Sequence, residues 1–166
     1  MQPSGHQLAQ LNVGRLVAPT DDPRLAEFMQ NLDRINDMGK RMPGFVWMME
    51  GSGAPGTGNT DTKIAGDPQF VANLTVWQDV PSLENFVWNT VHKIFYGRRR
   101  DWFDVSGQLH FVMWWVREGH RPTLDEALAR LEHLRTHGAS DFAFDWDYAR
   151  DAQLYTAHQC VTVAAE

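Results

Sequence analysis

The order of apolar patterns along the chain predicts an α+β fold with the element order β-α-β-β-α-β and an additional helix after it. Three observations support this prediction. Four short apolar runs, rich in β-branched and aromatic residues, have the length and composition of strands. Three longer segments have the composition of helices, with a capping residue or a proline at the start of each. The length of 166 residues fits a single domain.

The first strand is expected over residues 6–17, where apolar and polar side chains are interspersed in HQLAQLNVGRLV. Leu8 shares one face of this strand with Gln10 and Asn12, which puts two amide side chains on the same side of the sheet. The other face is apolar and carries Leu11 and Val13.

A first helix follows. Asp21 or Asp22 can cap it, and Pro23 suits the first helical position. One face then carries an apolar stripe at helical spacing, made of Leu25, Phe28, Met29, Leu32, Ile35 and Met38. We expect the helix to end at Gly39 or at the Pro43-Gly44 pair.

Two strands and a second helix come next. Residues 45–49 predict the second strand, and residues 51–66, rich in Gly, Thr, Asn and Asp, predict a surface loop. This loop lacks the Gly-Lys-Ser/Thr ending of a phosphate-binding loop. Residues 70–77 predict the third strand, and a long helix is expected from Pro81 to about Tyr96.

The fourth strand is expected over residues 109–116, LHFVMWWV, which are apolar on both faces. A strand of this kind needs cover on both sides. A third helix follows, because Thr123 and Glu126 form a capping-box pattern and Gly138 is a stop signal.

The element order is that of the split β-α-β, ferredoxin-like arrangement. In this arrangement the helices would cover one face of the sheet, and the sheet of a second subunit would cover the other. We therefore expect a homodimer. The domain is expected to span residues 1–140, and residues 141–166 form a C-terminal tail that is docked or partly disordered.

The bulk composition excludes several classes of function. A net charge of -6 argues against a nucleic-acid partner. The basic run Arg98–Arg100 is expected to be a solvated helix end or, alternatively, to capture a carboxylate or phosphate. Cys160 is the only cysteine, so neither an internal disulfide nor a cysteine-rich metal site can form. No apolar run spans a membrane, and the N-terminus lacks the pattern of a signal peptide, so we expect a cytoplasmic protein.

His92 lies on a second face of the expected long helix, among aromatic and amide side chains. If the helix is regular, His92 points away from the core stripe and lies one turn from Trp88 and from Tyr96. The core stripe consists of Leu83, Phe86, Val87, Thr90, Val91 and Ile94. His92 is then an acid/base group or a haem ligand facing a pocket, or else a dimer contact or a hydrogen-bonded surface residue.

Polar side chains inside the apolar strands form a second candidate set. They are Gln10, Asn12, Asn73, Thr75 and His110. Because buried polar groups need partners, these side chains either line a substrate pocket or bond one another at a dimer interface.

The remaining histidines have weaker patterns. His133 and His137 have a metal-compatible spacing, but no third ligand shares their face, so we predict a solvated helix end and no metal site. His120 is expected in a turn before the third helix. The chain also lacks a Gly-x-Ser-x-Gly motif, which leaves hydrolase chemistry without support.

Taken together, several segments resemble an uncharacterised bacterial family of the dimeric α+β barrel superfamily, which is similar to the antibiotic-biosynthesis monooxygenases. The matching segments lie between residues 6 and 140 and are HQLAQLN, DDPRLAEF, PGFVW, NLTVWQDVPSLENFV, the position of His92, RRRDWF, MWWV and GHRPTLDEALARLEHLRTHG. The resemblance implies the fold and a homodimer. The superfamily includes quinol and polyketide monooxygenases, haem-degrading monooxygenases, isomerases and dehydratases. The resemblance therefore implies an enzyme of one of these classes and does not select a single activity.

The resemblance also bears on cofactors. Haem-degrading members place an asparagine on the first strand and a tryptophan and a histidine on the second helix, and Asn12, Trp88 and His92 are similar to that set. Trp88 and His92 are closer in sequence here than in those enzymes. We therefore expect no cofactor, with haem held axially by His92 as the alternative.

The leading hypothesis is a small-molecule enzyme of monooxygenase type that acts on an aromatic or polycyclic hydrophobic metabolite. His92 would be the acid/base group, and Asn12 and Asn73 would orient a substrate oxygen. Substrate-binding residues would be Trp47, Trp77, Trp88, Tyr96, Arg99 and Phe103. The alternatives are a non-redox isomerase, cyclase or dehydratase on the same scaffold, and a protein that binds haem or a hydrophobic metabolite without turnover.

Overall fold

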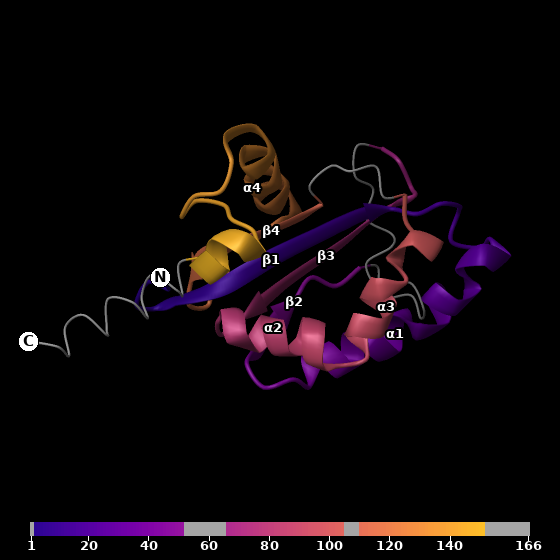
Figure 1. Cartoon of the computed structure of the whole chain (residues 1–166), viewed down its shortest axis with the longest axis horizontal. Helices are drawn as coiled ribbons and strands as arrows, with labels where there is room; N and C mark the ends of the chain where they lie inside the picture. The colour runs from indigo at the N-terminus through magenta and orange to yellow at the C-terminus, as the bar shows by residue number, and fades with distance from the viewer. Residues whose placement is uncertain (1, 52–65, 105–109, 152–166) are drawn as a thin grey trace, which may run out of the picture.

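The computed structural model describes residues 2–51, 66–104 and 110–151 (Figure 1). Most of the predicted loop over 51–66, the first residue of the predicted fourth strand and Cys160 lie outside the described residues.

Four strands form one antiparallel sheet in the order β2-β3-β1-β4. The strands are β1 (His6–Arg15), β2 (Phe45–Met48), β3 (Phe70–Trp77) and β4 (Phe111–Arg117). With α1 following β1 and α2 following β3, this strand order is the ferredoxin-like one. The predicted fold class and the positions of the four strands are confirmed.

The helices are η1 (Pro23–Leu25), α1 (Ala26–Lys40), α2 (Val80–Asn89), α3 (His92–Gly97), η2 (Arg99–Asp101) and α4 (Leu124–His137). Side-chain caps begin three of them. Asp22 accepts a hydrogen bond from the Arg24 backbone N–H, Asp79 from that of Ser82, and Thr123 from that of Glu126. The predicted stop of the last helix is also confirmed, because Gly138 follows α4 at a φ of 80°.

The prediction of one continuous helix from Pro81 to Tyr96 is wrong. The chain leaves α2 at Thr90, whose backbone is extended, and re-enters a helix at His92. The Thr90 hydroxyl donates to the Phe86 carbonyl at 2.6 Å and accepts from the His92 backbone N–H at 3.1 Å. A threonine hydroxyl thus replaces backbone partners of the helix and ends it.

The helices cover both faces of the sheet. Figure 1 shows α4 on one side of it and α1, α2 and α3 on the other. On the first side, Leu131 and Leu134 of α4 pack in one buried cluster with Leu11 and Trp114. The expectation that helices cover only one face is therefore wrong, because α4 supplies the second cover that the apolar β4 requires. The homodimer stays a prediction, which the solution mass measured by light scattering can check.

The chain after α4 continues the sheet. Phe144 is buried and pairs with Met113 through two backbone hydrogen bonds of 2.7 and 2.9 Å. Residues 146–151 then form a helical turn, drawn in yellow in Figure 1. This segment covers the outer edge of β4, and it reaches the face of the sheet that carries α1 and α2.

Candidate functional site

The sheet is incompletely covered on the face that carries α1 and α2. Five neighbouring residues of this face are only half-buried, although the adjacent residues on the other face of the same strands, such as Leu11 and Ala72, are buried. The five residues are neighbours across the strands. Asn12 lies opposite Asn73 on one side and Phe111 on the other, and Gly14 lies opposite Val71. We call Asn12, Gly14, Val71, Asn73 and Phe111 the cleft floor. These five residues are therefore partly accessible to solvent.

Polar groups on and beside the cleft floor are only partly satisfied. The Gln10 amide donates to Asn73 Oδ1 at 3.0 Å and to Thr75 Oγ1 at 2.7 Å, and the Trp77 indole donates to the same hydroxyl at 2.8 Å. Asn73 therefore keeps its NH₂ group for another acceptor. Among the described residues, the side chain of Asn12 makes no hydrogen bond, although it lies directly opposite Asn73. Within the residues that the structure describes, the Asn12 side chain and the Asn73 NH₂ group thus have no hydrogen-bond partner.

A row of aromatic side chains leads away from the cleft floor. Phe111 stacks on Trp146 at 5.3 Å between ring centroids, Trp146 meets Trp88 at 6.2 Å, and Trp88 meets Tyr96 edge-on at 5.3 Å. All four are half-buried rather than buried, so their rings keep accessible surface. We call Phe111, Trp146, Trp88 and Tyr96 the aromatic wall. It offers stacking surface to a flat ligand.

His92 lies at the Tyr96 end of the aromatic wall. Its ring packs on Phe86 at 4.8 Å and on Tyr96 at 6.4 Å. The break at Thr90 causes this placement, because the expected continuous helix would have turned His92 away from Phe86. Burial lowers the pKa of His92 below its ordinary value, with partial opposition from the Val87 backbone carbonyl. Burial therefore favours the neutral form of the imidazole.

Unpartnered buried nitrogens gather around Tyr96. Of five buried side-chain N or O atoms that lack a partner in the described residues, three are Trp88 Nε1, His92 Nδ1 and Arg99 Nε. All three side chains contact the Tyr96 ring, with the Arg99 guanidinium 4.4 Å from its centroid. Because buried polar atoms normally have partners, this cluster indicates a place where a ligand or water completes the bonding.

The other predicted site residues lie elsewhere. Trp77 is 1% exposed and stacks on Phe86, inside the core. Phe103 packs beside the cleft floor, where a Cβ added to Gly14 would meet its ring at 2.5 Å. Trp47 of β2 packs with the cluster under α4 and lines a separate surface hollow of about 380 Å³. The structure therefore joins His92, Trp88, Tyr96 and Arg99 in one group and Asn12 with Asn73 in another, with Phe111 and Trp146 linking the two.

Sequence reasoning missed Phe111 and Trp146. The available signal for Trp146 was the aromatic-acidic run DFAFDWDY, which was assigned to a tail outside the domain. Its aromatic residues are spaced two apart, the spacing of a strand, and Phe144 does pair with β4.

The remaining histidines form contacts without a metal-binding arrangement. His120 lies 2.8 Å from Glu126, and the ring of His133 stacks on that of His137 at 4.5 Å. Within residues 2–51, 66–104 and 110–151, no group of three or more His, Cys, Asp and Glu side chains could hold a metal ion. None of the helices in those ranges is long and apolar enough to cross a membrane.

Comparison with solved structures finds similar folds at low sequence identity. A conserved protein from Methanosarcina mazei is 12% identical, with 69% of this chain and 94% of that chain covered and a TM-score of 0.46. A protein of unknown function from Nitrosomonas europaea is 8% identical, with coverages of 73% and 97% and a TM-score of 0.45. SnoaB from Streptomyces nogalater, a cofactor-independent oxygenase, is 16% identical, with coverages of 72% and 98% and a TM-score of 0.42.

The sequence comparisons give the family. No curated protein matches the chain. Residues 7–160 match the family described as a domain of unknown function, DUF3291, so the match includes β1 at one end and runs past the segment that carries Trp146 at the other. An uncharacterised family was expected from the resemblance of the sequence, and the chain belongs to the DUF3291 family.

Proposed function

We propose that the protein is a small-molecule enzyme that binds a polycyclic aromatic compound between the cleft floor and the aromatic wall and removes a proton from it. The observation that carries this proposal is the state of His92. Its ring lies against Tyr96, its Nδ1 atom has no hydrogen-bond partner in the described residues, and burial lowers its pKa, which favours the neutral imidazole. A group of this kind suits a general base.

The surroundings of His92 support the same chemistry. The aromatic wall can stack on a flat ring system, which gives binding without fixed polar contacts. The amide groups of Asn12 and Asn73 can donate hydrogen bonds to a substrate oxygen on which negative charge develops. Few polar groups in a largely aromatic site are typical of a pocket for a hydrophobic small molecule.

The proposed reaction is an oxygenation of monooxygenase type. After His92 takes a proton from an activated CH₂ group, the resulting carbanion is electron-rich enough to reduce O₂. One oxygen atom becomes the oxygen of a new C=O group on that carbon, and the other leaves as water with the two hydrogens of the CH₂ group. Carbon is oxidised and O₂ is reduced, so the balance closes without a further reductant. Deprotonation is then the step that the protein assists.

Oxygen uptake with anthrone tests this proposal. Anthrone has three fused rings and a CH₂ group activated by its two flanking aromatic rings. We expect the wild-type protein to raise the rate of O₂ consumption above the uncatalysed rate, and His92→Gln to remove most of that increase, on the order of 10²-fold or more. The control is His137→Gln, because His137 is exposed on α4. Its rate should equal that of the wild type.

The other outcomes separate the alternatives. Saturable quenching of tryptophan fluorescence by anthrone without O₂ uptake would contradict oxygenation and favour a non-redox isomerase, cyclase or dehydratase, or a binding protein. Full activity in His92→Gln would show that His92 is not the base. A saturable Soret shift on haem titration that His92→Gln abolishes would instead make His92 a haem ligand.

A further inference from the structure

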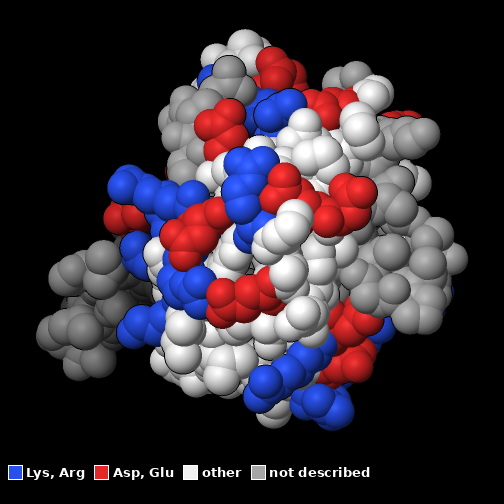
Figure 2. Space-filling view, turned by 90° about the vertical axis from the view of Figure 1, so that its right-hand side faces the viewer, with Lys and Arg blue, Asp and Glu red and all other residues white. Residues whose placement is uncertain are grey.

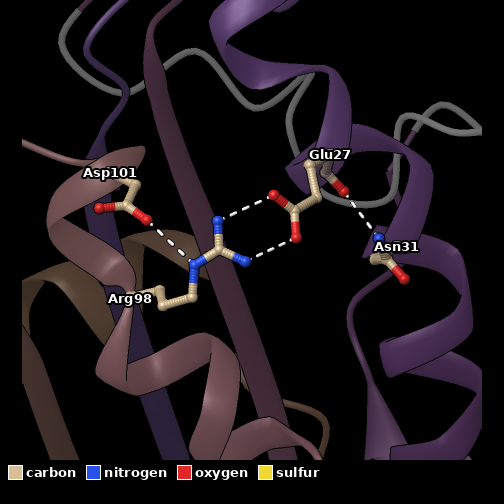
Figure 3. Close-up of polar contacts among 4 residues, drawn as sticks. All are labelled: Glu27, Asn31, Arg98 and Asp101. Atoms are coloured by element: carbon tan, nitrogen blue, oxygen red, sulfur yellow. Dashed lines mark hydrogen bonds and ion pairs between the residues drawn. The ribbon is translucent and has the colours of Figure 1, made fainter.

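The three consecutive arginines after α3 have different surroundings. Arg98 is saturated with carboxylates. Its two terminal nitrogens donate to Glu27 of α1 at 2.6 and 2.8 Å, and its Nε donates to Asp101 at 3.0 Å (Figure 3). Glu27 and Asp101 raise the pKa of Arg98 above its usual value. Each of the three guanidinium nitrogens of Arg98 therefore already donates to a carboxylate, so Arg98 cannot form a bidentate pair with a ligand.

Arg99 has no such partner. Its side chain is half-buried, and its guanidinium carbon lies over the Tyr96 ring of the aromatic wall, 4.4 Å from the ring centroid. Its Nη1 donates to the Tyr96 backbone carbonyl at 3.0 Å. In the part of the chain that the structure describes, no carboxylate lies within ion-pair distance of Arg99, and its buried Nε has no acceptor. A partly buried cation without a counter-charge is unfavourable unless something else supplies one.

Trp88 Nε1 is the second unpartnered donor beside Tyr96. An indole N–H and an arginine Nε–H can only donate hydrogen bonds, so both require an acceptor from outside the described residues. A carboxylate has two oxygens that accept several hydrogen bonds, and it matches the planar guanidinium. A carboxylate would therefore supply the negative charge that Arg99 lacks among the described residues.

We propose that the Arg99 guanidinium binds the carboxylate of an aromatic carboxylic acid at the Tyr96 end of the aromatic wall. This inference rests on the proposed function and adds the substrate class to it. The carboxylate fixes one end of the ligand, and the ring system extends along the wall towards Phe111 and the cleft floor.

A matched pair of probes tests the proposal. 2-Naphthoate and 2-naphthamide share the same two-ring system and differ in charge. Isothermal titration calorimetry should show that the wild-type protein binds 2-naphthoate about tenfold or more tightly than 2-naphthamide, since a charge-assisted hydrogen bond contributes at least that ratio. Arg99→Gln should lower this preference to near one while it leaves the affinity for 2-naphthamide unchanged. Retained binding of 2-naphthamide shows that the variant is folded.

Arg100→Gln is the control. Arg100 is the exposed neighbour of Arg99, and this substitution removes the same positive charge from the protein as Arg99→Gln. It should keep the preference for 2-naphthoate. Equal affinity of the wild type for both probes, or an undiminished preference in Arg99→Gln, would overturn the carboxylate site alone and leave the cleft intact. A wild-type protein that binds neither probe would overturn the proposed cleft itself, and the carboxylate site with it.

Discussion

A single buried imidazole gives the protein a defined dependence of stability on pH. The pKa of His92 is lowered in the folded state, so the unfolded chain binds its proton more readily. The free energy of unfolding should therefore be highest above the unfolded pKa of about 6.5 and fall as the pH drops below it. Urea denaturation at pH 7.5, 6.5 and 5.5, as a series, measures the effect.

The comparison with His92→Gln isolates this histidine. A glutamine cannot take up a proton in this range, so the variant should lose less stability than the wild type between the highest and the lowest pH. His137→Gln, on the exposed end of α4, should keep the slope of the wild type. Equal slopes in the wild type and His92→Gln would contradict the buried neutral state.

The second prediction at the scale of single residues concerns Thr75. It is 2% exposed, and its hydroxyl accepts hydrogen bonds from the Gln10 amide and the Trp77 indole. Thr75→Val keeps the shape but leaves the Trp77 indole N–H without its acceptor and removes one of the two side-chain acceptors of the Gln10 amide. We expect a loss of about 1–3 kcal/mol in the free energy of unfolding, measured by urea denaturation. A loss below about 0.5 kcal/mol would show that both donors find other partners.

Several residue positions could be predicted from the sequence and several could not. The shared strand face of Gln10 and Asn12 follows from the two-residue period of a strand, and the structure has it. The surroundings of His92 did not follow, because they depend on one hydroxyl of Thr90 that competes with the backbone. Propensity and periodicity average over a segment and do not resolve such a competition.

At the scale of elements, α1 and the segment from α3 to η2 are joined by an exposed ion-pair group and by the packing of Phe28 on Trp102. Arg98 holds Glu27 and Asp101, and the Glu27 carbonyl also accepts from Asn31 one turn later in α1 (Figure 3). Exposed pairs contribute little to global stability because water screens them. Their effect should therefore be on local opening of the short helix rather than on the unfolding midpoint.

Hydrogen exchange can detect that local effect. Glu27→Gln should raise the amide exchange rates of α3 and η2 while those of α2 stay unchanged, and the thermal midpoint should shift little. Glu132→Gln, which alters an exposed ion pair with Arg135 on α4, is the control. Unchanged exchange in α3 would mean that apolar packing, including that of Phe28 on Trp102, holds the segment to α1 without the ion pair.

The boundaries of most elements were predictable because their signals are local. Short runs rich in apolar residues placed the strands, and Thr123 and Gly138 placed both ends of α4. What the sequence did not show is which face α4 covers. That choice depends on the packing of Leu131 and Leu134 against residues far away in the chain, and no local pattern encodes it.

At the scale of the whole molecule, charge is mixed over the surface. On the face shown in Figure 2, Lys and Arg side chains lie among Asp and Glu side chains rather than in one basic patch. Together with a net charge of -6, this distribution offers no counterpart to a nucleic-acid backbone on that face.

The segment after α4 completes both the sheet and the aromatic wall, and Phe144 anchors it. Phe144 is 1% exposed, whereas Phe142 is 48% exposed. Phe144→Ala should lower the free energy of unfolding by about 3–5 kcal/mol, because it removes a large buried ring. Phe142→Ala should cost much less, on the order of 1 kcal/mol. Urea denaturation of the two variants measures the difference, and similar losses would show that the segment is not anchored through Phe144.

The position of Trp146 also has a consequence for how the protein is made. Every strand and helix of the sheet precedes it in the chain, and yet it is the ring that joins Phe111 to Trp88. Because the N-terminal part of a chain leaves the ribosome first, β1, β2 and β3 become available for pairing before Trp146 does. The contacts that join Phe111 to Trp88, and with them the proposed ligand site, are therefore completed only after these strands have been made.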